Sequence, residues 1–174
     1  MTEDMNVLKN DSRQVAFVAF DVEKETWNKY KLQDGTLLKI KFILINILAP
    51  KGMDDVMKNA KEKGTVSLDL AIQSSNIMGV EAPPNLIGMP TSAVCSTQEL
   101  QESIVESDID FEAISESQNR YLLHFGDTDE AELKIKISPI GVSRTSKFDQ
   151  YGIPLYFVNF NVIANISKIQ SSKK

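Results

Sequence analysis

The sequence predicts an α+β protein that is mainly antiparallel β, with a barrel- or sandwich-like sheet built from two pseudo-repeated β-hairpin units and two short helices. Two turn signals, Asp34-Gly35 and a second over residues 126–129, each separate a pair of strand-like runs. Residues 155–166 (LYFVNFNVIANI) give the strongest strand pattern of the chain, because alternate apolar side chains share one face.

The composition is that of a globular protein, with 42% hydrophobic and 25% charged residues in 174. This length is enough for one domain with a substantial core. We expect a single domain between disordered tails, containing two half-repeats and an acidic insert of loop and helix between them. The corresponding ranges are 14–167 for the domain, 1–13 and 168–174 for the tails, 26–73 and 118–167 for the half-repeats, and 74–117 for the insert.

Strands and turns account for most of the first half. Residues 14–22 are apolar and β-forming, which predicts a strand buried on both sides. Residues 27–32 and 36–48 flank Asp34-Gly35, so we expect a hairpin with a type I′ turn. Apolar residues at helical spacing predict a short helix over 53–60, and strict alternation predicts a strand over 66–72.

Residues 74–95 combine glycine and proline with apolar side chains that follow neither period, which predicts a long loop. Ser96 and Glu99 then form a capping-box pattern, the expected start of the second helix, whose apolar seam includes Ile104. Residues 119–125 and 131–142 form the second hairpin, and 155–166 the last strand.

The two hairpins resemble each other in sequence. Asn28-Lys29-Tyr30 and Leu38-Lys39-Ile40-Lys41 recur as Asn119-Arg120-Tyr121 and Leu133-Lys134-Ile135-Lys136. A duplicated unit would pair its halves about a pseudo-two-fold axis and so cover the sheet edges. The alternative is that such motifs are simply typical of half-exposed strands.

Cysteine usage and hydropathy bear on location. Cys95 is the only cysteine, so no intramolecular disulfide is possible, and we interpret it as buried and inert. The N-terminus lacks the pattern of a signal peptide, and the longest apolar run, 42–49, is too short to span a bilayer. These features favour a cytoplasmic protein without membrane contact. The acidic pI of about 5.0 argues against nucleic-acid binding.

Basic residues on the two hairpins are candidates for ligand binding. If the hairpins pair about a pseudo-two-fold axis, they could form one patch that holds phosphate or carboxylate groups. The alternative is that these side chains only protect strand edges. The candidate residues are Lys39, Lys41, Lys134, Lys136 and Arg120.

Apolar residues in the 74–95 segment are candidates for an interaction surface. They are numerous for a solvated loop, and three prolines would lower the entropy lost on docking. The alternative is a loop that packs on its own side chains. The candidates are Ile77, Met78, Leu86, Ile87 and Met89.

No catalytic residue set and no cofactor motif is predicted. The leading hypothesis is a non-enzymatic binding or assembly protein of unknown ligand, which associates with itself, as a dimer, or with an unidentified protein. The alternative is a metal-assisted hydrolase or lyase with an acidic site in the second turn. Its candidate residues are Asp127, Asp129, Glu130, Glu132 and His124.

Overall fold

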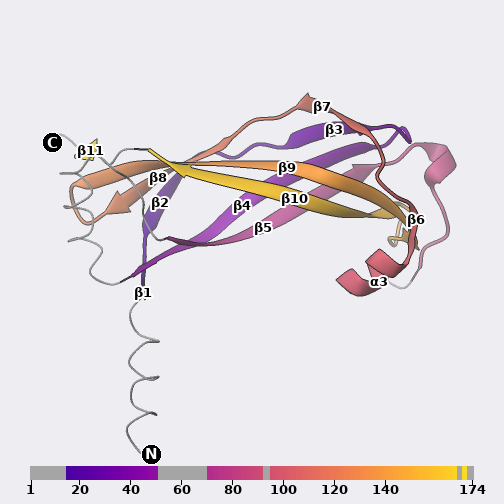
Figure 1. Ribbon diagram of the computed structural model, residues 1–174, viewed down its shortest axis with the longest axis horizontal. Coiled ribbons are helices and arrows are strands. Elements are labelled where there is room, and N and C mark those ends of the chain that lie inside the picture. Colours follow the sequence, from indigo (N-terminus) through magenta and orange to yellow (C-terminus); the bar gives the residue numbers. More distant parts are fainter. Residues whose placement is uncertain (1–14, 51–69, 92–94, 168–169, 172–174) are drawn as a thin grey trace, which may run out of the picture.

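The structure, a computed structural model, describes residues 15–50, 70–91, 95–167 and 170–171. These residues form two antiparallel sheets that share one hydrophobic core, and the described strands do not close into a barrel. The expected mainly antiparallel β architecture is therefore confirmed as two sheets. Figure 1 shows an elongated molecule in which β9 and β10 run along most of the length.

The first sheet has the strand order β5-β4-β3-β7, and a short strand, β1, pairs with the far end of β4. The strands are β1 (Val15–Phe17), β3 (Asn28–Leu32), β4 (Leu37–Pro50), β5 (Ala71–Glu81) and β7 (Phe111–Ser115).

The second sheet has the strand order β10-β9-β8-β2, and β6 and β11 pair with other parts of the long strand β9. The strands are β2 (Ala19–Lys24), β6 (Ile104–Glu106), β8 (Asn119–Phe125), β9 (Asp129–Phe148), β10 (Pro154–Ile166) and β11 (Gln170–Ser171). A 3-10 turn η1 (Pro84–Leu86) and a helix α3 (Thr97–Glu102) lie at one end of the molecule (Figure 1).

The two halves of the chain exchange one strand each. β2 directly precedes β3 in the chain, yet it pairs with β8 of the other sheet, where Val22 lies opposite Tyr121. Likewise β7 precedes β8 but pairs with β3, where Ala113 lies opposite Tyr30. Each exchanged strand carries a bulge. Neither sheet is complete without a strand from the other half.

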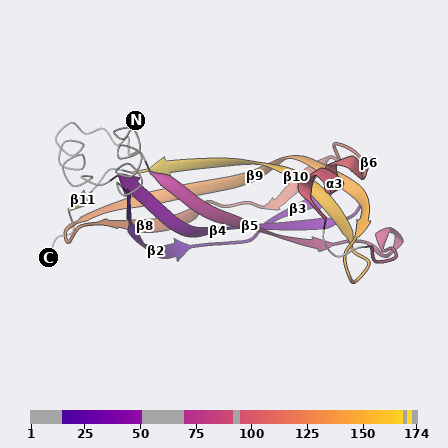
Figure 2. The ribbon, with the colours of Figure 1, turned by 90° about the horizontal axis from the view of Figure 1, so that it is seen from below.

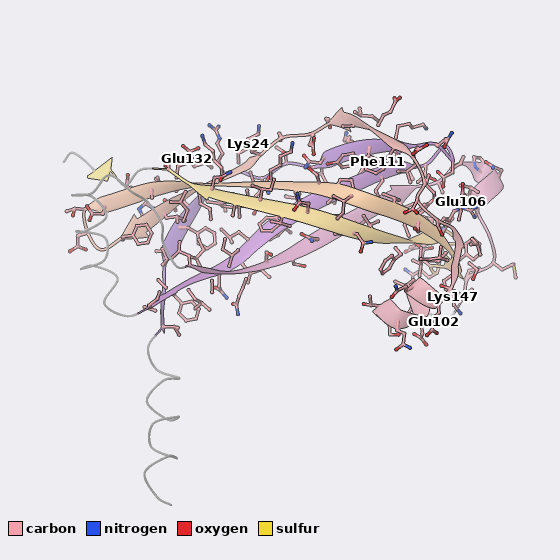
Figure 3. The ribbon with its side chains drawn as sticks, in the orientation of Figure 1. Lys24, Glu102, Glu106, Phe111, Glu132 and Lys147 are labelled. Carbon is pink, nitrogen blue, oxygen red and sulfur yellow. The ribbon has the colours of Figure 1, made fainter. Side chains whose placement is uncertain are left out.

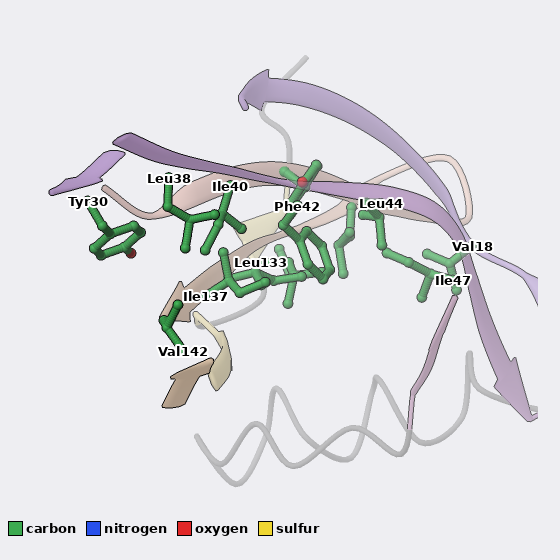
Figure 4. Close-up of a cluster of buried hydrophobic side chains, with 14 of the residues drawn as sticks. Val18, Tyr30, Leu38, Ile40, Phe42, Leu44, Ile47, Leu133, Ile137 and Val142 are labelled. Atoms are coloured by element: carbon green, nitrogen blue, oxygen red, sulfur yellow. The ribbon is translucent and has the colours of Figure 1, made fainter. Parts of the chain in front are cut away.

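Alternate side chains of β4 and β9 form the centre of the core. Leu38 and Ile40 on β4, and Leu133 and Ile135 on β9, are at most 1% exposed. Figure 4 shows the β4 side chains pointing toward Leu133 on the facing sheet. Burying a leucine or isoleucine of this kind stabilises a fold by about 1.5–3 kcal/mol. The alternation of apolar and polar residues along β4 and β9 therefore follows from this two-layer packing, in which one face of each strand is buried.

The first hairpin is confirmed, but its turn type is not. Gly35 has φ +96°, whereas Asp34 is not among the described residues with positive φ, so the turn is not type I′. Instead the Asp34 carboxylate accepts a hydrogen bond from the Thr36 amide at 2.9 Å and another from the Tyr156 hydroxyl at 2.6 Å. The aspartate thus fixes the turn and also ties it to β10.

The strand predicted over residues 14–22 is in fact two strands in different sheets. The prediction that it is buried on both sides is wrong, because the side chains of β1 and most of those of β2 are exposed. The reason is the strand exchange: β2 lies at the margin of the second sheet, where one edge has no neighbour among the described strands. In residues 15–22, Val18, between the two strands, is buried in the core, and the partly buried Phe20 packs against it.

The loop predicted over 74–95 is also corrected, because β5 covers residues 71–81, and loop with a 3-10 turn is found only in the rest of its described residues. The capping box at Ser96 and Glu99 is present, but the helix ends at Glu102 and Ile104 begins a strand. The first predicted helix, most of the strand predicted over 66–72, and nearly all of the two predicted tails lie outside the described residues.

Candidate assembly surface

Side-chain amides close the gap between the exchanged strands. β4 and β9 extend past the ends of β3 and β8, which leaves main-chain groups on that edge without a neighbour among the described strands. Asn28 donates a hydrogen bond to the carbonyl of Ile137 at 3.2 Å, and Asn119 donates one to the carbonyl of Phe42 at 3.1 Å. Both asparagines are buried. This side of the sandwich is therefore closed by structural hydrogen bonds.

Two tyrosine and glutamate pairs extend that network. The Tyr121 hydroxyl donates to Glu25 at 2.9 Å, and the Tyr30 hydroxyl donates to Glu116 at 3.2 Å. Burial, followed by the neighbouring glutamate, raises the pKa of each tyrosine. The Ser138 hydroxyl, which also donates to Glu116, is the main cause of the lowered pKa of that carboxyl group. These groups hold the two halves of the chain together.

The structure separates the basic residues predicted to form one patch. They alternate with core residues on β4 and β9, so they lie on the outer faces of different sheets. Each lysine also contacts its own carboxylate: Lys39 with Glu81 at 2.5 Å, Lys41 with Glu25 at 3.9 Å, Lys134 with Glu132 at 3.7 Å and Lys136 with Glu116 at 3.6 Å. Arg120 lies opposite Lys134 on the second sheet. Their role in ligand binding stays a prediction.

The acidic residues of the alternative metal site lie around the turn between β8 and β9. His124 contacts Asp21 through Nε2 at 2.8 Å and Glu130 through Nδ1 at 3.4 Å. Within the described part of the chain, no group of three or more His, Cys, Asp or Glu side chains is arranged to hold a metal ion. The metal site therefore stays a prediction without a supporting arrangement.

The predicted interaction residues fall into two groups. Ile77 and Met78 lie on β5, where they are 44% and 39% exposed. Leu86, Ile87 and Met89 lie in or after η1, in a segment that docks on the turn between β9 and β10. There the Gly88 amide donates to the carbonyl of Gly152 at 2.9 Å. The second group thus belongs to a loop that packs on its own protein, although Met89 is 84% exposed.

A cavity of about 450 Å³ lies where the end of β5 approaches the start of β10. Met78 and Val80 line it from β5, Leu100 from α3, and Ile153 and Tyr156 from the turn and β10. This cavity therefore lies between β5 of the first sheet and β10 of the second.

β5 and β10 are edge strands of the two sheets. Among the described strands, β5 pairs only with β4 and β10 only with β9. Residues 73–78 and 161–165 are exposed on both faces of their strands, and Val162 and Ile163 are 45% and 47% exposed. Figure 2 shows β10 at the margin of the ribbon with β9 beside it. We call this pair of strand edges the open side.

The other two edge strands are protected against pairing. β2 has 6 residues, among them Asp21, Glu23 and Lys24, and β7 has 5 residues with Glu112. Both are bulged. Short length, charge and bulges are the usual protection of a sheet edge. β10, by contrast, has 13 residues without a charged side chain, and β5 has 11 with only Glu81. The labelled charged side chains Lys24 and Glu132 lie in the half of the molecule away from α3 in Figure 3.

Sequence reasoning missed the open side for two reasons. The predicted strand 66–72 includes the start of β5, but the predicted loop 74–95 takes in the polar run Ser74-Ser75-Asn76, which belongs to β5. β10 was recognised as a strand, and its lack of charge was visible in the sequence. Only the sheet order shows that this uncharged strand lies at an edge.

Among the described residues, no helix is long and apolar enough to cross a membrane. No protein-family model, curated protein or solved structure is detectably similar to this chain.

Proposed function

We propose that this protein is a non-enzymatic assembly protein that associates with copies of itself through the open side. The observation that carries the proposal is the contrast between protected and unprotected strand edges in one molecule. A long uncharged edge offers unpaired main-chain groups to another strand, and such edges otherwise lead to aggregation. An edge that is covered by a specific partner strand does not aggregate in this way.

Exposed apolar side chains on the open side support the same proposal. Val162 and Ile163 point to opposite faces of β10, and Ile77 and Met78 do the same on β5. A partner strand would cover side chains on both faces and would pair main-chain groups at the same time. Neither the burial of these side chains nor the main-chain hydrogen bonds require charged residues, and β10 has none.

We also propose that the chain arose by internal duplication. The two sheets share one strand order, and Asn28 and Asn119 make matching hydrogen bonds. The bulges support the proposal as well, because Ile45 of β4 is skipped in the register with β5, and Ile140 of β9 is skipped in the register with β10. These similarities go beyond the sequence motifs of the two hairpins.

Sedimentation velocity over a range of protein concentrations tests the assembly proposal. We expect a concentration-dependent shift from monomer to dimer or a larger species in the micromolar range, which is typical of small interfaces. A compact monomer throughout, up to several hundred micromolar, would contradict it. Circular dichroism of the same samples should show β-structure, so that association of unfolded protein is not mistaken for assembly.

A further inference from the structure

We propose that β10 pairs with β10 of a second copy, in antiparallel orientation, around a two-fold axis at Ile163. The pairing joins the second sheets of two copies into one continuous sheet. It rests on the proposed function, because it assigns the strand, the partner and the register of the self-association.

β10 is the better of the two open edges for this contact. It has no charged residue, so two identical strands approach without repulsion, whereas β5 ends in Glu81. Near its start, β10 lies beside Leu100 of α3, with which it lines the cavity. From residue 159 onward, the described residues provide no neighbour on its outer edge. The exposed part is long enough for a strand pair of ordinary length.

The sequence of β10 is self-complementary around Ile163. With the axis at this residue, Asn161 lies opposite Asn165 of the second copy, so amide side chains meet on the outer face. On the core face Val162 lies opposite Ala164, and Phe160 opposite Ile166. A shift of the axis by one residue places an asparagine opposite Ile163 instead. Because directly opposed side chains interact most strongly, the alternation favours one register.

The neighbouring charges tolerate this contact. On β9, Lys136 lies opposite Ile163 and Lys134 lies opposite Asn165. Each lysine has a carboxylate within ion-pair distance: Glu116 lies 3.6 Å from Lys136, and Glu132 lies 3.7 Å from Lys134. The two copies therefore meet along an uncharged strand, with locally balanced charges on either side.

The substitution Ile163→Lys tests the strand assignment. Two lysines would then meet at the two-fold axis, and we expect the dissociation constant to rise by about a hundredfold or more. Ile114→Lys is the control, because Ile114 is also an exposed strand isoleucine, at 58% against 47% for Ile163, but lies on β7, outside the open side. Its dissociation constant should stay within about threefold of the wild type.

The register is tested by charge exchange on the same strand. Asn161→Lys alone should weaken association, and Asn161→Lys with Asn165→Glu should restore it, because each lysine then faces a glutamate of the second copy. Circular dichroism shows whether Ile163→Lys folds. If it does not, the single and double asparagine variants test the strand assignment in its place.

The outcomes separate the two proposals. A wild type that stays monomeric overturns both the assembly function and the β10 contact. Self-association that survives Ile163→Lys, or that Ile114→Lys weakens equally, overturns the β10 contact and leaves the assembly function standing. Failure of the double charge exchange to restore association overturns the register.

Discussion

Asn28 and Asn119 make equivalent hydrogen bonds in opposite directions across the sandwich. Asn28, on β3 of the first sheet, donates to Ile137 on β9, and Asn119, on β8 of the second sheet, donates to Phe42 on β4. Their side-chain oxygens accept from the amides of Ser117 and Thr26 at 3.0 and 3.3 Å. Each asparagine therefore links the segment that follows an exchanged strand to a central strand of the facing sheet.

Replacing either asparagine by alanine should destabilise the protein by about 1–3 kcal/mol, because a buried carbonyl and a main-chain amide each lose a partner. We expect similar losses for Asn28→Ala and Asn119→Ala, measured as the free energy of unfolding in urea. Asn46→Ala is the control, since among the described residues the Asn46 side chain bonds only to that of Gln73, in a solvent-exposed hydrogen bond. A loss at one asparagine alone would contradict the equivalence.

Gly88→Ala should destabilise the protein by about 1–3 kcal/mol, because its added methyl group would lie 2.5 Å from the Phe148 ring. The ring or the docked segment must then move. In Gly141→Ala the nearest atom to the new methyl group is 3.7 Å away, an ordinary contact. We expect that control to melt within about 2 °C of the wild type.

Gly35→Val should destabilise the first hairpin, since a β-branched residue resists the φ of +96° at this position. The new side chain would also press on Pro83, whose Cγ lies 3.3 Å from the position of a Cβ. We expect a loss of about 1–3 kcal/mol in the free energy of unfolding. An unchanged melting temperature would show that the turn adapts.

Stability should fall as the pH rises above about 10, the ordinary pKa of tyrosine. Burial, followed by the hydrogen bond to Asp34, raises the pKa of Tyr156 in the folded protein. The unfolded chain thus releases this proton at a lower pH than the folded one, and the stabilisation present below pH 10 is lost at higher pH. In Tyr156→Phe the urea midpoint should fall less steeply between pH 9 and 11. Equal slopes would contradict the raised pKa.

Local patterns in the sequence were enough to predict both hairpins and the last strand. The alternation around Leu38 and Leu133 indicates strands with one buried face, and Gly35 and Gly152 indicate turns. Both kinds of feature depend on residues that are close in the chain. The capping box at Ser96 is equally local.

Partners distant in the chain decided the rest. The predicted basic patch required knowledge of which faces meet, and Lys39 and Lys134 prove to lie on outer faces of different sheets. The exchange of β2 and β7 left no local signal, because a swapped strand looks like any other strand. For the same reason, the edge position of β10 followed only from the sheet order.

The strand exchange also bears on how the protein folds. Val22 pairs with Tyr121, and Asn28 bonds to Ile137, so the sheets are completed only by contacts between residues far apart in the chain. Closing such large loops costs entropy before the contacts form, and folding dominated by them is slow. During synthesis, the first half emerges with the outer edge of β3 lacking β7 beside it. The nascent chain therefore exposes unpaired strands until the C-terminal half has been made.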